Sequence, residues 1–256
     1  MKRKAIIVLP VVLVLAAGFF LTGHFLKSGG AEKYSITDTQ YKCTEYASKT
    51  PEEIAASLTL EQKAAQMVMP AVYNIDVKQM RDNDYGCILS QSDHIDAASW
   101  RSLVDEYQNA ALLSDAGIPY IYGQDDIHGV NYCLNAVYFP HNIGQGAAND
   151  EELAYQVGLI TADEAKLCHM LWNYSPCIAQ SVDPRWGRTY ESYGSDLETV
   201  TKLSTAYTKG LIDGGLVACA KHYLADGNAE YGTGEKRRYR YAYRSRRCKA
   251  QRRRDK

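Results

Sequence analysis

The apolar residues of this chain fall into short runs that are separated by longer amphipathic stretches. The short runs predict strands at residues 67–72, 86–90, 119–123, 174–179 and 216–221. The amphipathic stretches between them predict helices over residues 97–116, 151–170 and 197–213, because their apolar positions recur at helical spacing. Strands that alternate with helices are typical of an α/β fold with parallel strands.

Helix start signals place the beginning of the folded domain near residue 50. Thr50, Pro51 and Glu53 form a capping box with proline at the first helical position, and Thr59 with Gln62 forms a second box. The polar residues 28–49 before them predict a spacer.

The N-terminus has the pattern of a targeting segment. Lys2, Arg3 and Lys4 precede an apolar run over residues 5–21. Residues 1–27 therefore predict a signal peptide or a membrane anchor, and the two readings stay open, with a buried soluble helix as a lesser alternative. Positive residues before such a segment predict an extracytoplasmic body, either secreted or membrane-anchored.

The charge of −1 hides two unlike parts. Residues 236–256 hold 12 of the 29 basic residues and one acid, while residues 1–235 hold 17 basic against 29 acidic residues. We expect residues 50–235 to be a domain and 236–256 to be a basic tail that is non-native, for example a frame-shifted end, or disordered. An arm for nucleic acid is the alternative, but an extracytoplasmic body argues against a nucleic-acid partner.

Composition excludes several classes of protein. The apolar content of 46% is enough for a sizeable core. The seven cysteines include no C-x-x-C pair, so a zinc knuckle, a redox motif or a complete disulfide framework is not expected. Dinucleotide, P-loop, serine-hydrolase and zincin motifs are absent from the sequence.

Charged residues follow three of the predicted strands. Asp125, Asp126 and His128 come after residues 119–123, and Lys221 with His222 ends the strand at 216–221. The third group lies in the stretch 183–193, which joins two arginines, two carboxylates, an indole and two phenols. Such a mixture suits a sugar, because charged groups bind hydroxyls and aromatic faces stack on the ring.

Other uses of these residues remain open. The loop 123–129 has Asp and His ligands for a metal ion, although no metal site is expected from it, or it is a solvated turn. Lys221 ends an apolar strand, so it needs an anionic or hydroxyl partner unless it emerges into water. Of Arg185 and Arg188, we expect one to make a structural ion pair and one, Arg188, to face a ligand.

Together these motifs resemble glycoside hydrolase family 3, in its β-glucosidase branch. The resemblance runs in family order from about residue 55 to 235 and rests on residues 58–63, Asp125 with His128-Gly129, residues 139–142, residues 183–193, and Lys221-His222-Tyr223 with Asp226-Gly227. It implies the family's N-terminal TIM-like (β/α) barrel, here incomplete with about five strand units.

The resemblance also implies an activity and a site. Asp125, Arg188, Glu191, Lys221 and His222 would bind the terminal sugar of a β-glucoside or gluco-oligosaccharide, and no cofactor is implied. Family members hydrolyse terminal, non-reducing β-D-glucosyl residues with retention, which requires two carboxyl groups. The family's Ser-Asp-Trp-like nucleophile motif is absent from the sequence and its acid/base comes from a second domain, so we expect a truncated chain without catalytic residues. A β-xylosidase or an inactive glycan-binding remnant are the alternatives.

Overall fold

The computed structural model describes residues 42–90, 93–223, 226–228 and 230–232. The predicted signal or anchor at 1–27 and the basic tail at 236–256 lie outside these residues. In the described part, the search for a helix both long and apolar enough to cross a bilayer finds none.

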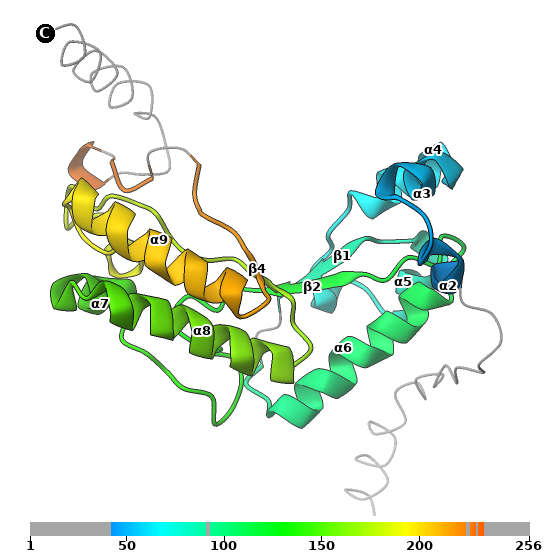
Figure 1. Cartoon of the computed structure of the whole chain (residues 1–256), viewed down its shortest axis with the longest axis horizontal. Helices are drawn as coiled ribbons and strands as arrows, with labels where there is room; N and C mark the ends of the chain where they lie inside the picture. Colours follow the sequence, from blue (N-terminus) through cyan, green and yellow to red (C-terminus); the bar gives the residue numbers. More distant parts are fainter. Residues whose placement is uncertain (1–41, 91–92, 224–225, 229, 233–256) are drawn as a thin grey trace, which may run out of the picture. The chain divides into compact units, whose positions relative to one another are not determined.

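The centre of the fold is a sheet of four parallel strands (Figure 1). The strands are β1 Cys87–Leu89, β2 Ile121–Gln124, β3 Trp172–Asn173 and β4 Val217–Ala218, and they pair in the order of the sequence. Parallel neighbours require a crossover connection, and helices supply it between successive strands. The predicted α/β fold with parallel strands is therefore confirmed.

Two of the five predicted strands differ from the structure. Residues 67–72 form no strand, because Ala71 makes only an isolated bridge to Leu89 before the 3₁₀ helix η1, Val72–Asn74. The strand predicted at 174–179 lies earlier in the structure, at Trp172–Asn173. Each predicted run contains a proline, Pro70 or Pro176, which has no N–H for a ladder hydrogen bond and so interrupts strand pairing.

The three long helices form where the pattern predicts them. They are α6 Ala97–Leu112, α8 Glu151–Leu167 and α9 Leu197–Asp213. Each begins after an aspartate whose side chain accepts a backbone N–H of the first turn, namely Asp96, Asp150 or Asp196. This contact satisfies a donor that the helix itself leaves unpaired.

Five shorter helices complete the described part: α2 Lys42–Tyr46, α3 Pro51–Ser57, α4 Leu60–Gln66, α5 Val77–Asn83 and α7 Asn142–Ala148. The predicted capping boxes at Thr50 and Thr59 are both present. Helix α2 lies within the predicted spacer, and its Tyr46 hydroxyl donates to the Ala116 carbonyl over 2.8 Å. The spacer therefore includes a segment that contacts the domain.

The core lies between the sheet and the long helices. Trp100 of α6 and Tyr122 of β2 are both buried, with ring centroids 5.8 Å apart in an edge-on arrangement. Helices α8 and α9 lie side by side (Figure 1), and Gly158 meets Gly210 where their backbones approach closely. This packing fixes the loop between β3 and α9, which carries residues of the candidate site.

Candidate active site

The candidate site is built at the carboxyl ends of three neighbouring strands. Asp125 follows β2, Arg188 and Glu191 lie in the segment after β3, and Lys221 with His222 follows β4. Because β2, β3 and β4 are adjacent and parallel, their carboxyl ends lie at the same edge of the sheet. A bridge between Cys177 and Lys221 extends the pairing of the last two strands toward the site.

Lys221 and Asp125 form an ion pair across the site. The Lys221 Nζ donates to the Asp125 carboxylate, and the lysine is only 9% exposed, whereas the aspartate side chain is 42% exposed. A buried ammonium is costly without a partner, and Asp125 supplies it. The outer part of Asp125 remains accessible, so it can still accept hydrogen bonds from a ligand.

Arg188 and Glu191 form a second, bidentate pair. The Arg188 Nε and Nη2 donate to the two Glu191 oxygens over 2.8 and 2.6 Å, and the Glu191 side chain is 5% exposed. Burial acts to raise the pKa of Glu191, but the hydrogen bonds and charge of Arg188, with the charge of Lys221, hold it below its ordinary value. Glu191 is therefore ionised, and it fixes the planar Arg188 fork.

Arg185 behaves differently from Arg188. Its side chain is 64% exposed and pairs with Asp183, with 2.9 Å between Arg185 Nε and Asp183 Oδ1. This pair lowers the pKa of Asp183 to about 2 through hydrogen bonds from the Arg185 side chain and backbone. Arg185 is thus the arginine in an exposed ion pair, and Arg188 lies in the half-buried network with Glu191.

His222 has a partner that the sequence prediction did not assign to the site. Its Nδ1 lies 2.7 Å from Asp226 Oδ2, and the Asp226 side chain is 12% exposed. Both side chains lie within 4.8 Å of the buried Cys177 thiol, counted between one ligand atom of each residue. The spacing of four residues between His222 and Asp226 was a usable signal, but nothing in the sequence indicated that Cys177 would join them.

The Asp and His side chains of the loop 123–129, the alternative metal ligands, lie apart in different surroundings. Asp125 pairs with Lys221, and the His128 Nδ1 lies 3.0 Å from the Phe139 carbonyl oxygen. Asp126 is 1% exposed, and its carboxyl oxygens have no hydrogen-bond partner among the described residues. Among those residues, the side chains that could hold a metal are Cys177, His222 and Asp226.

The structure joins four of the five predicted site residues in one network and places the fifth, His222, next to Lys221 in the chain. The charge of Lys221 acts on Glu191, which connects the Asp125 pair to the Arg188 pair, and His222 follows Lys221 through a cis peptide bond. The network offers ammonium and guanidinium donors beside carboxylate acceptors. This is the set of groups that binds neighbouring hydroxyls of a polyol.

Comparison with known proteins identifies the family of this chain. Residues 59–243 match the model of the glycosyl hydrolase family 3 N-terminal domain, a range that extends beyond the predicted domain end at residue 235. The chain is 31% identical to a lysosomal β-glucosidase of Dictyostelium discoideum, over 51% of this chain and 17% of that protein. It is 33% identical to a β-xylosidase/α-L-arabinofuranosidase of Medicago sativa, over 46% of this chain and 18% of that protein.

A solved structure gives the same result for the fold. The exo-1,3/1,4-β-glucanase of a Pseudoalteromonas species superposes with a TM-score of 0.68 at 34% identity, covering 77% of this chain and 26% of the glucanase. The chain thus spans about a fifth of the length of the curated relatives and about a quarter of the glucanase. The match nevertheless covers most of this chain, which therefore belongs to glycosyl hydrolase family 3 through the N-terminal domain of that family.

Proposed function

We propose that this domain binds the terminal, non-reducing β-D-glucosyl residue of a β-glucoside or gluco-oligosaccharide through Asp125, Arg188, Glu191, Lys221 and His222. The proposal rests on two neighbouring ion pairs at one edge of the sheet, Lys221–Asp125 and Arg188–Glu191. Each pair orients a cation and a carboxylate toward neighbouring hydroxyls. The family reaction would be hydrolysis of the β-glucosidic bond.

The full fold in this proposal is a TIM-like barrel, of which β1 to β4 are consecutive strands. The four described strands pair in sequence order, as the strands of such a barrel do. The apolar segment at 5–21 after three basic residues supports a secreted or membrane-anchored location of the domain.

The proposed role of this chain is binding rather than cleavage. Retention requires two carboxyl groups about 5–5.5 Å apart, one as nucleophile and one as acid/base. Asp125 and Glu191 are each held by a cation, an arrangement that suits them to accepting hydrogen bonds from sugar hydroxyls. The alternative is a β-xylosidase specificity, which the 33% identity to a xylosidase favours.

Titration calorimetry with glucose and with xylose tests the binding. Arg188→Ala removes the fork held by Glu191, and we expect a loss of about 1.5–3 kcal/mol in binding free energy, which is roughly tenfold or more in affinity. Arg185→Ala is the matched control. We expect it to leave the affinity unchanged, because Arg185 is exposed and pairs with Asp183 rather than with the site residues. Equal losses in both variants contradict the assignment of Arg188, and tighter binding of xylose supports the alternative.

Turnover of an aryl β-glucoside tests the second half of the proposal. We expect none above background from this chain. Turnover at the ordinary enzymatic rate of about 1–1,000 per second shows that the chain cuts the bond and overturns the binding-only role, while leaving the sugar site intact.

A further inference from the structure

We propose that Cys177, His222 and Asp226 form a binding site for Zn²⁺ beside the sugar site, and that the bound ion, by taking His222 Nδ1 and shifting the ring, weakens the binding of a sugar by His222. The second half of this inference rests on the proposed function, and the first half does not. The three side chains offer a sulfur, an imidazole nitrogen and a carboxylate oxygen, all within 4.8 Å of one another. Zn²⁺ is bound by these three ligand types, with a fourth position for water or a ligand.

Two of the ligands, Cys177 and His222, follow neighbouring strands whose continuations are fixed to each other. Cys177 lies after β3, and it forms a parallel bridge with Lys221, the residue before His222. The Ile178 N–H donates to the Lys221 carbonyl over 2.7 Å, and the Lys221 N–H donates to the Pro176 carbonyl over 3.0 Å. The backbone on both sides of the cluster is therefore held by hydrogen bonds, so the ligands are positioned before an ion arrives.

The side chains need only small movements to surround an ion. His222 Nδ1 and Asp226 Oδ2 are 2.7 Å apart, which is hydrogen-bond distance. Zinc bonds of about 2.0–2.3 Å place tetrahedral ligand atoms roughly 3.3–3.7 Å from one another. The ion would take the place of this hydrogen bond and separate the two atoms by about an ångström or less, and the thiol sulfur lies within 4.8 Å of a ligand atom of each residue.

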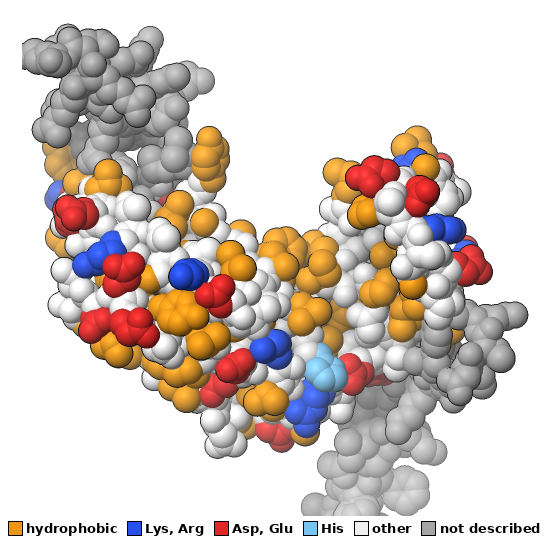
Figure 2. Space-filling view, in the orientation of Figure 1, with side chains coloured by type: hydrophobic (Ala, Val, Ile, Leu, Met, Phe, Trp, Pro, Cys, Tyr) orange, Lys and Arg blue, Asp and Glu red, His pale blue; other side chains and the backbone are white. Residues whose placement is uncertain are grey.

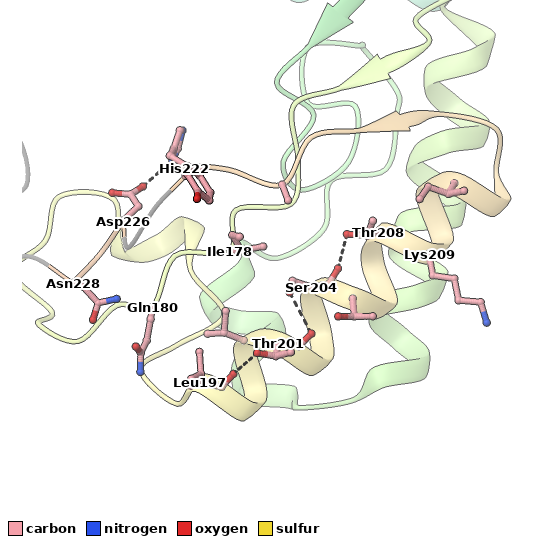
Figure 3. A pocket seen from close by; sticks show the side chains of 15 residues that line it. Ile178, Gln180, Leu197, Thr201, Ser204, Thr208, Lys209, His222, Asp226 and Asn228 are labelled. Atoms are coloured by element: carbon pink, nitrogen blue, oxygen red, sulfur yellow. Dashed lines mark hydrogen bonds and ion pairs between the residues drawn. The ribbon is translucent and has the colours of Figure 1, made fainter. Parts of the chain in front are cut away.

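An open groove gives the ion a path to the cluster. The groove has a volume of about 810 Å³ and lies between α9 and the segment after β4. His222 and Asp226 both line it, and Figure 3 shows their hydrogen bond at the edge of the groove. Cys177 is fully buried behind them, so the two accessible ligands meet the ion first and the thiol completes the site.

The thiol must lose its proton to solvent when the ion binds. Burial raises the pKa of Cys177 to about 11, while a backbone hydrogen bond from Ala179 acts to lower it. A metal ion deprotonates a coordinating thiol outright, and the positive charge of nearby Arg188 favours the thiolate as well. The thiol releases one proton to solvent for one Zn–S bond, the proton at His222 Nδ1 moves to Nε2 so that Nδ1 can bind the ion, and no oxidation state changes.

Binding of Co²⁺ as a spectroscopic probe, followed by competition with Zn²⁺, tests the site on the full chain. We expect one equivalent of Co²⁺ with a sulfur-to-metal absorption band, and displacement by Zn²⁺. We expect Cys177→Ser and Asp226→Asn each to weaken metal binding by about 10–100-fold or more, because loss of a residue that only hydrogen-bonds to a metal ligand already lowers metal affinity by that factor. Cys219→Ser is the matched control, a partly exposed thiol two residues after Val217 in the same segment, and it retains the band.

The outcomes separate the two halves of the proposal. If the Co²⁺ absorption band survives in both Cys177→Ser and Asp226→Asn, the proposed metal site is wrong. Two variants are used so that the test remains valid if one of them fails to fold. Saturating Zn²⁺ should weaken glucose binding in the unmodified chain and leave it unchanged in Cys177→Ser. Metal binding without any effect on glucose overturns the competition alone, whereas a chain that binds Zn²⁺ but no sugar at all contradicts the proposed function and not the metal site.

Discussion

At the scale of single residues, the site depends on which charges share a buried environment. Lys221 is 9% exposed and Glu191 is 4% exposed, yet each lies next to an opposite charge. The sequence indicated which residue types stand at the strand ends. It could not indicate the pairing, because the partners are supplied by segments that are 96 residues apart for Asp125 and Lys221.

Asp126 is the residue whose burial has the clearest consequence for stability. Burial raises its pKa well above the ordinary value, and the charges of Asp125 and Glu164 act in the same direction. The folded protein therefore keeps this carboxyl protonated while the unfolded chain ionises near pH ~4. Below about pH 4 the carboxyl is protonated in both the folded and the unfolded chain, so its titration does not change stability. As the pH rises between the unfolded and the folded pKa of Asp126, the free energy of unfolding falls by up to about 1.4 kcal/mol per pH unit.

Asp126→Asn tests this directly. The amide cannot ionise, so we expect the variant to gain stability over the unmodified protein as the pH rises from about 4 to about 7, measured by urea unfolding at each pH. Asp163→Asn is the control, because Asp163 is exposed in a surface pair with Lys166. A constant difference between Asp126→Asn and the unmodified protein across this range contradicts a protonated Asp126.

At the scale of elements, the long helices were predictable and the strands less so. Helices α6, α8 and α9 have long periodic patterns and aspartate caps, which are local signals. The strands have only two to four residues, so a short apolar run with a proline could not locate them. Pairing between strands depends on tertiary contacts, which a local pattern does not contain.

The contact between α8 and α9 makes a prediction about glycine. A Cβ at Gly210 would lie 2.2 Å from the Tyr155 carbonyl oxygen, which belongs to the backbone and cannot move aside easily. Alanine favours a helix by about 1 kcal/mol over glycine, but forcing the helices apart costs about 1–3 kcal/mol or more. We therefore expect Gly210→Ala to lower the midpoint of thermal unfolding despite its higher helix propensity.

Gly187→Ala is the matched control for this substitution. A Cβ at Gly187 has no described atom within 4 Å, and its backbone is outside the left-handed region. The control should leave the midpoint unchanged or raise it slightly, because alanine reduces the freedom of the unfolded chain. If Gly210→Ala is as stable as this control, then α8 and α9 can move apart to admit the methyl group without a loss of stability.

At the scale of the whole molecule, the described sheet has an open edge. Within the described residues β4 pairs with β3 alone, and Val217 of β4 is 52% exposed. Leu197 and Ile212 of α9 are 62% and 58% exposed. Figure 2 shows hydrophobic side chains interspersed with charged ones on the face that carries α8 and α9. This surface therefore combines charges that favour solubility with apolar side chains that favour association.

An exposed strand edge with apolar neighbours promotes association between copies. We expect the isolated chain to self-associate in a concentration-dependent manner, as measured by light scattering coupled to size-exclusion chromatography. Val217→Lys should shift the distribution toward monomer, because a lysine on an edge strand opposes pairing with another edge. Leu60→Lys is the control, since Leu60 is 77% exposed on α4 and not part of the sheet. A monodisperse monomer of the unmodified chain, with cooperative melting, would show that the edge is covered.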